Sequence, residues 1–291
     1  MSEHARFDVV VGVNGTGSSL YAVKWAAEEA ANRGGTLRLV CAWSTSRLAP
    51  IRPVRGSTED TAEITTEGMR LLDVAALVAA TVSPGLEVHT ELVVGSPPLV
   101  LSEASRSADL LVLGDRGPGG CTGMLVGSVA AAVVDLTTCP VLIVRGRVNR
   151  TGPVVVGVDG SPSDGLVLAA AFDRAERAGT SVLAIHTWTV PAHLLPTPWG
   201  TETRSAQHAA RRVLDAALAP FGRSHPMVRV DRYVVTGSPT AALVLASASA
   251  QLVVVGSHGA STALRGLLAA NACSRDVHHA HCRVEVVRSA A

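Results

Sequence analysis

The residues best suited to chemistry lie between positions 114 and 128, where glycines alternate with polar side chains. Gly114 and Gly117 follow the apolar run 110–113, and Gly127 and Ser128 precede an Ala/Val-rich segment. The run is typical of a buried strand, and the segment of a helix. A helix that begins after a glycine-rich loop presents unpaired N–H groups and a partial positive charge. The pattern therefore predicts a phosphate site, with Ser128 as N-cap and hydroxyl donor.

Several catalytic motifs are missing from the sequence. It has no GxxxxGK[ST] motif, which excludes a P-loop NTPase. Leu20 breaks the GxGxxG pattern that begins at Gly15, and the next expected strand ends in Trp43 rather than an acidic residue. Val255 stands where a nucleophile elbow requires glycine. We therefore expect a binding protein and not an enzyme.

Strand and helix patterns alternate along the chain and would position this loop. Ser18 and Ser19 offer N-caps for a helix that ends near Gly34, a long loop is expected at 44–60, and a helix at 61–82. Ligands of open α/β sheets bind at the carboxyl ends of strands, near the switch point where the strand order reverses. Here the switch point would bring Asn14 close to Gly114. Alternation predicts an α/β fold with a parallel sheet. The expected strands are 7–13, 36–43, 87–94, 110–113 and 141–144.

The second half of the chain repeats the first after a linker at 146–152. The segment Val-Val-Val-Gly-Val-Asp-Gly at 154–160 repeats Val-Val-Val-Gly-Val-Asn-Gly at 9–15. Gly-Ser-Pro at 237–239 repeats 95–97, and Gly256 to Gly259 repeats Gly114 to Gly117. Such duplication predicts two tandem domains, 1–146 and 153–291.

Together these motifs resemble the universal stress protein family. The resemblance covers nearly the whole chain and rests on Val-Gly-Val-Asp-Gly-Ser at 156–161, on the spacing Gly114-x2-Gly117-x9-Gly127-Ser128, and on a Cys-Pro-Val before the last strand of the first repeat. It implies two doubly wound five-stranded parallel sheets, of order 3-2-1-4-5, with helices on both faces. It also implies an ATP site where the glycine loop is kept, with no established catalytic chemistry, and leaves open whether Mg²⁺ accompanies the nucleotide.

Carried over by position, the resemblance implies a nucleotide site in each repeat. Asn14 takes the place of the first-strand aspartate near adenosine, and Ala42 would offer its backbone to the adenine. The glycine loop would hold the ribose and phosphates. The implied residues are Val13, Asn14, Gly15, Ala42, Gly114, Gly117, Gly127, Ser128 and Val129 in the first repeat, and Asp159, Gly256 and Gly259 in the second.

Both repeats depart from the family pattern. In the first, Asn14 keeps a hydrogen-bond acceptor but loses the charge of the aspartate. In the second, Ala269 and Ala270 replace the final Gly-Ser. The lost hydroxyl costs about 1.5–3 kcal/mol of hydrogen bonding to a charged group. Alanine at a position of positive φ would add about 1–2 kcal/mol of strain. We therefore expect ATP chiefly in the first domain.

Simpler interpretations of these residues stay open. The glycines could only form a tight loop, and Asn14 could be a turn residue with a local backbone bond. Arg116 could reach a phosphate or remain solvated, and His258 fits a loop residue better than an acid or base. His278 to Cys282 have the spacing of metal ligands, but histidines also suit the negative end of a helix dipole, which we favour.

Composition limits the class of protein. Hydrophobic residues make up 47% and aromatic residues 3%, so Val, Leu, Ile and Ala must build the core. A net charge of +1 without a long basic block argues against nucleic-acid binding. No apolar stretch is long enough to span a bilayer, and the N-terminus lacks a signal-peptide pattern. Five cysteines without CxxC spacing indicate reduced thiols in the cytoplasm, and Cys139 and Cys282 suit packing.

We therefore expect an ATP-binding regulatory or sensing protein of the stress response, which acts through an unknown protein partner. Nucleotide binding could order the loops at 44–60 and 118–126. The resemblance also implies that the two domains pair about a pseudo-two-fold axis through their last strands, and a homodimer of whole chains stays open. The alternatives are a structural or dimerisation module that binds no nucleotide, and a weak ATP hydrolase.

Overall fold

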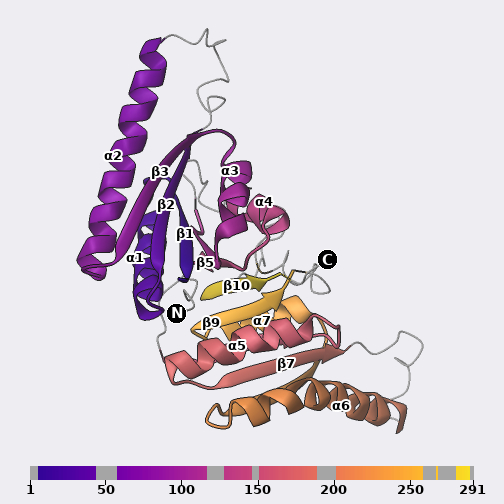
Figure 1. Cartoon of the computed structure of the whole chain (residues 1–291). Coiled ribbons are helices and arrows are strands. Elements are labelled where there is room, and N and C mark those ends of the chain that lie inside the picture. Colours follow the sequence, from indigo (N-terminus) through magenta and orange to yellow (C-terminus); the bar gives the residue numbers. More distant parts are fainter. Residues whose placement is uncertain are drawn as a thin grey trace. The chain divides into compact units, whose positions relative to one another are not determined.

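The computed structural model describes residues 6–43, 58–116, 128–145, 151–188, 201–257, 267 and 280–288, with the side chains of 58–64 and 201–203 excepted. The chain divides into two compact units, Met1–Val144 and Arg145–Ala291. Figure 1 shows the strands and helices of each unit.

The first unit is a parallel five-stranded sheet in the order β3-β2-β1-β4-β5. Helices α1 and α2 pack against each other on one face, and α3 and α4 on the other (Figure 1). This order confirms the predicted doubly wound fold. The strands are β1 (Asp8–Val13), β2 (Thr36–Trp43), β3 (Glu87–Val94), β4 (Leu110–Gly114) and β5 (Val141–Val144). The helices are α1 (Gly17–Asn32), α2 (Thr58–Val82), α3 (Pro97–Ala104) and α4 (Ser128–Leu136), with a 3₁₀ turn, η2, at Ser105–Ser107.

The second unit repeats this topology, with the parallel order β8-β7-β6-β9-β10. Even single hydrogen bonds recur: Gly95 N–H donates to the carbonyl of Trp43 at 2.8 Å, and Gly237 N–H to that of Trp188 at 3.0 Å. The strands are β6 (Val154–Val158), β7 (Val182–Trp188), β8 (Val230–Thr236), β9 (Leu252–Gly256) and β10 (Arg283–Val287). The described helices are α5 (Asp164–Ala178), α6 (Thr201–Ser224) and α7 (Pro239–Ser247).

The central strands form the core of each unit. Val9, Val10 and Val11 of β1 are fully buried, as expected for a parallel strand covered on both faces. A Cβ atom at Gly12 would lie 2.8 Å from Leu113 and 3.2 Å from Leu101. Glycine at this position therefore leaves room for the side chains of Leu101 and Leu113 against β1.

Two predicted helix starts are wrong. The N-cap of α1 is Thr16 and not Ser18 or Ser19, because the Thr16 hydroxyl accepts a hydrogen bond from Ser19 N–H at 3.2 Å. Helix α2 begins at Thr58, so the last three residues of the loop expected at 44–60 are helical instead. Residues 44–57 lie outside the described part of the chain.

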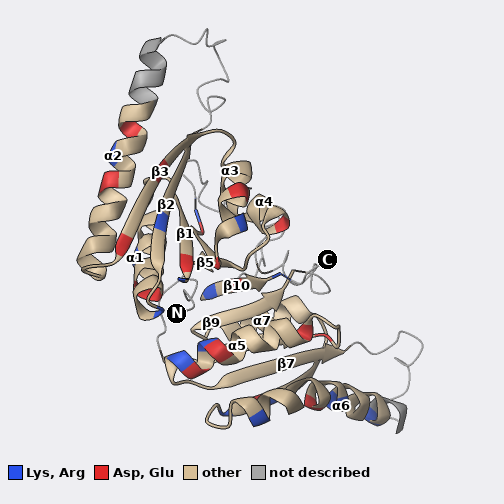
Figure 2. Ribbon diagram, in the orientation of Figure 1, with Lys and Arg blue, Asp and Glu red and all other residues tan. Residues whose placement is uncertain are grey.

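Charged residues of both signs are interspersed on the described helices and strands (Figure 2). Within the described part of the chain, no helix is both long enough and apolar enough to cross a bilayer.

Candidate functional site

The carboxyl ends of β1 and β4 meet at the point where the strand order reverses. Residues of β1 pair in parallel with those of β4, so Asn14, which follows β1, and Gly114, which ends β4, lie at the same edge of the sheet. A Cβ atom at Gly114 would lie 2.7 Å from the carbonyl carbon of Ser18 and 2.8 Å from its oxygen. Glycine at 114 therefore allows the first turn of α1 to reach β4, a packing role in addition to any contact with a ligand.

Hydrogen bonds tie the residues after β4 to the start of α1. Ser18 Oγ donates to Asp115 Oδ1 at 2.6 Å, and the Thr16 hydroxyl lies 3.4 Å from the carbonyl oxygen of Arg116. The Asp115 side chain is 14% exposed and lies beside the N-terminus of α1, whose dipole stabilises an anion. The Arg116 side chain remains exposed. The positive end of α1 is therefore already occupied by a carboxylate.

Asn14 forms a local turn. Its side-chain oxygen accepts hydrogen bonds from the Thr16 N–H at 3.1 Å and the Thr16 hydroxyl at 2.7 Å, which is the Asx-turn geometry. Its backbone N–H lies 3.4 Å from Ser19 Oγ. Within the described residues, the amide nitrogen of the Asn14 side chain has no hydrogen-bond partner. The side-chain oxygen of Asn14 is thus used within the turn, whereas its amide nitrogen can donate to another group.

Two carboxylates stand at the corresponding place in the second unit. Asp159 Oδ1 accepts from Ser161 N–H at 2.9 Å, and Asp164 accepts from Gly160 N–H at 2.8 Å and Asp159 N–H at 3.3 Å. Burial raises the pKa of Asp164, the Asp159 carboxylate raises it further, and the two N–H donors offset part of the rise. The strand ends of the second unit therefore carry more carboxylate side chains than those of the first unit.

The residues that pair with the last residues of β1 and β6 differ between the two units. Cys41 of β2 pairs with Val13, and His186 of β7 pairs with Val158. His186 is 8% exposed, and its Nδ1 lies 2.8 Å from the carbonyl oxygen of Val158, so this nitrogen carries the proton. Burial, and secondly the charge of Glu67, raises the pKa of Cys41.

The cysteines before the last strands are also buried. Cys139 is 6% exposed and Cys282 2%. Burial raises the pKa of Cys139 to about 11 and that of Cys282 to about 12. Each thiol lies 3.4 Å from the carbonyl oxygen of the next residue.

The remaining predicted residues are distributed around the two switch points. Val13 is buried, Ala42 is half-buried in β2, and Gly15 has a φ of +74° that favours glycine. Ser128 is the first residue of α4 and is exposed, and Val129 follows it. Gly256 ends β9 and is buried. Several residues lie outside the described part of the chain, namely Gly117, Gly127, His258, Gly259, Ala269, Ala270, His278 and His279.

The sequence analysis missed Thr16, Asp115 and Asp164. Thr16, two residues after Asn14, carries the signal of an Asx turn followed by an N-cap. Asp164 stands in the first turn of α5, where acidic residues are favoured. Asp115 offers no signal in the sequence, because its role depends on the contact with Ser18. Among the described residues, no group of three His, Cys, Asp or Glu side chains is placed to hold a metal ion.

These features define a duplicated, doubly wound α/β protein whose strand ends meet at a switch point in each unit. The family model of the universal stress protein family matches residues 7–145 and 151–288. The chain belongs to this family.

The chain is similar to proteins of known sequence and of known structure. Universal stress protein Rv2005c of Mycobacterium tuberculosis is 35% identical over 292 residues, which cover 96% of each chain. The crystal structure of a universal stress protein from Archaeoglobus fulgidus has a TM-score of 0.68 with 16% identity, over 97% of this chain and 96% of that one, and so shares the fold. A universal stress protein solved in complex with cAMP is 31% identical over 49% of this chain and 98% of its own, with a TM-score of 0.37.

Proposed function

We propose that this protein binds ATP, chiefly in its first unit, and acts as a regulatory or sensing protein of the stress response. The observation that supports this most is the meeting of Asn14 and Gly114 at the switch point between β1 and β4. Ligands of doubly wound sheets bind at this point. The chain runs from β4 through the glycine loop to the N-terminus of α4, which suits the phosphates.

The electrostatics of the first unit favour this placement. Asp115 lies at the start of α1, so the phosphates would avoid that helix and occupy the start of α4, at Ser128. The free amide nitrogen of Asn14 can donate to a ribose hydroxyl or to an acceptor nitrogen of adenine.

The second unit is the poorer site in this proposal. Asp159 and Asp164 place two acidic groups at its strand ends, where the first unit has Asn14 and Ser19. Two unit charges about 4 Å apart in a partly buried site interact by about 4 kcal/mol. Repulsion of this kind, together with Ala270 in place of Ser128, would disfavour a triphosphate.

The role of the protein would be binding and not turnover, in the cytoplasm, with a protein partner that reads the nucleotide-bound state. An accompanying Mg²⁺ would be held mainly by the phosphates, because no carboxylate other than Asp115 precedes the glycine loop at the end of β4.

Isothermal titration of the full chain with ATP tests the proposal. Ser128→Ala should weaken binding about 10- to 150-fold, since a hydroxyl bonded to a charged group contributes about 1.5–3 kcal/mol. Ser224→Ala, which removes an exposed hydroxyl at the end of α6, is the control and should bind as wild type.

The other outcomes separate the alternatives. Absence of heat and of a thermal shift at millimolar ATP would leave a structural or dimerisation module. Sustained release of phosphate that disappears in Gly117→Ala would identify a hydrolase instead.

A further inference from the structure

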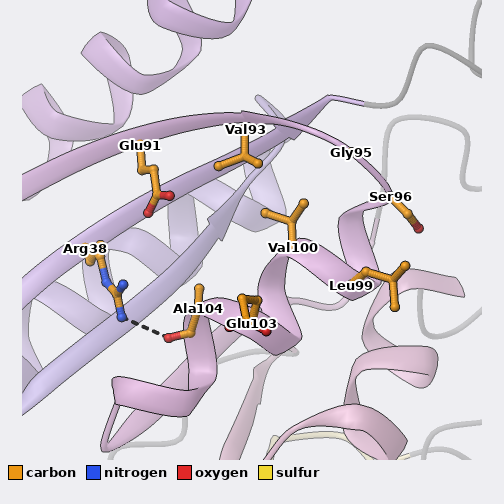
Figure 3. Close-up of a pocket in the computed structure, with 9 residues that line it drawn as sticks. All are labelled: Arg38, Glu91, Val93, Gly95, Ser96, Leu99, Val100, Glu103 and Ala104. Carbon is orange, nitrogen blue, oxygen red and sulfur yellow. Dashed lines mark hydrogen bonds between the residues drawn. The ribbon is translucent and has the colours of Figure 1, made fainter.

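A groove opens in the first unit between strand β3 and helix α3 (Figure 3). Its volume is about 540 Å³, and it shares no lining residue with the predicted nucleotide site. Residues of β2, β3, α3 and the turn between β3 and α3 line it, namely Arg38, Glu91, Val93, Gly95, Ser96, Leu99, Val100, Glu103 and Ala104.

The groove exists because α3 does not cover the edge of the sheet. β3 is the edge strand of this unit, while α3 packs on β2 and α4. Gly95 brings the end of β3 close to α3, since a Cβ atom there would lie 3.0 Å from Val100. The two elements therefore approach each other closely at Gly95.

Arg38, the cation at the base of the groove, forms several hydrogen bonds within the protein. Its Nη2 atom donates to Asp8 Oδ2 at 3.1 Å, to the carbonyl oxygen of Ala104 at 2.9 Å and to Ser107 Oγ at 3.0 Å. Its Nε atom is buried without a hydrogen-bond partner. Asp8 thus neutralises the guanidinium, and little of its charge is left to repel a cationic ligand.

The two carboxylates of the groove are not neutralised in this way. Glu91 forms no ion pair or hydrogen bond among the described residues, and Figure 3 shows its carboxylate directed into the groove. Among the residues that the structure describes, Glu103 is paired only with Arg106, at 3.2 Å, and both side chains are more than two-thirds exposed. Such an exposed pair contributes about 1 kcal/mol at most, so a ligand can displace it. The groove therefore has unsatisfied negative charge.

Apolar side chains line the other half of the groove. Figure 3 shows Val93 above Val100, with Leu99 beside them toward Ser96. Leu99 is 62% exposed, which is high for a large apolar residue. Apolar surface next to one unpaired and one weakly paired carboxylate matches a ligand that has a carbon chain and a cationic end.

We propose that this groove binds an aliphatic amine, with its ammonium group between Glu91 and Glu103 and its carbon chain on Val93, Leu99 and Val100. The ammonium would gain two charge-assisted hydrogen bonds. The chain would remove apolar surface of Leu99 from water.

The second unit provides an internal comparison. When the repeats are aligned on their Gly-Ser-Pro segments, Tyr233 stands at the position of Glu91 and Leu245 at that of Glu103. Both carboxylates are thus replaced. When β2 and β7 are aligned on Trp43 and Trp188, Leu183 of β7 stands in place of Arg38. The second unit cannot hold an ammonium group in the same way, so one amine should bind per chain.

Titration of the full chain with hexylamine, without nucleotide, tests the proposal by nuclear magnetic resonance of assigned backbone amides. The amides of Gly95 and Val100 should shift in a saturable manner. Hexan-1-ol and hexanoate, which keep the chain but not the cation, should bind at least tenfold more weakly. Raising the salt concentration from about 0.02 M to about 0.3 M should weaken hexylamine binding.

Substitutions of the two groove carboxylates test where the amine binds. Glu91→Gln combined with Glu103→Gln should raise the Kd for hexylamine at least tenfold, with unchanged circular dichroism. Asp73→Asn, which removes one exposed negative charge from α2 on the opposite face of the sheet, is the matched control and should leave the Kd unchanged.

Three results would overturn the proposal: methylamine and hexylamine binding equally well, hexan-1-ol binding as tightly as hexylamine, or binding that survives the double glutamine variant. The first would indicate pairing of ions at a surface, and the second an apolar site without charge recognition. Because no nucleotide is present, these results are independent of ATP binding.

Discussion

The carboxylate of Asp164 accepts a hydrogen bond from the backbone N–H of Gly160 at 2.8 Å, where the first unit uses the hydroxyl of Ser19 near the N–H of Asn14. Both side chains brace the turn that follows the first strand of their unit. The hydroxyl does so without charge, whereas the buried carboxylate does so beside Asp159. The stability of the turn in the second unit therefore depends on the protonation of Asp164, whereas the turn in the first unit has no such dependence on Ser19.

Asp164→Asn should make the stability of the chain less dependent on pH. The pKa of Asp164 is raised in the folded state above its ordinary value of 3.8. Protonation of Asp164 therefore favours folding, and this contribution is complete below about pH 4 and is lost as the pH rises through the raised pKa. Relative to the Asn variant, wild type should lose free energy of unfolding between about pH 4 and pH 7. Urea unfolding at several pH values measures this, and parallel curves for the two proteins would contradict it.

Glu285→Gln should destabilise the second unit by about 3–5 kcal/mol, because it removes the carboxylate that is paired with the buried Arg174 guanidinium. The two side chains are 5% and 10% exposed, and Arg174 Nε lies 2.7 Å from Glu285 Oε2. Asp173→Asn, which breaks the exposed pair with Arg177, is the control and should change stability by less than about 1 kcal/mol. Urea unfolding compares them. Equal effects of the two substitutions would show that burial of the Arg174 pair is not decisive.

Gly114→Ala should destabilise the first unit by about 1–3 kcal/mol, because its Cβ atom would meet the backbone of Ser18. Gly17→Ala, in the first turn of α1, meets no atom within 4 Å and should be neutral or stabilise the helix by up to about 1 kcal/mol. Thermal and urea unfolding measure both variants. A neutral Gly114→Ala would mean that this glycine is needed only for a ligand.

The strands could be predicted because they depend on local patterns, whereas their order was implied by the resemblance to the family. Each buried parallel strand is a short apolar run, such as 9–11 or 110–113, and its end is marked by a glycine or a polar residue. Duplication made the second unit predictable from the first. The switch point at Asn14 and Gly114 then followed from the general rule for open sheets.

Contacts between distant residues could not be predicted in this way. The bond between Ser18 and Asp115 joins residues 97 positions apart, and neither residue alone indicates it. The groove beside β3 depends on how far α3 covers the sheet, which is decided by packing. The N-cap of α1 was misassigned because three hydroxyl residues, Thr16, Ser18 and Ser19, compete for the role within four positions.

The burial of Cys139 and Cys282 bears on how a protein of this family could sense stress. A thiol with a pKa of about 11 is ionised to only about one part in ten thousand at pH 7. Peroxides and disulfides react with the thiolate, so oxidants would react only slowly with these two side chains. If the protein responds to oxidative stress, the response would therefore not depend on sulfur chemistry at these two positions.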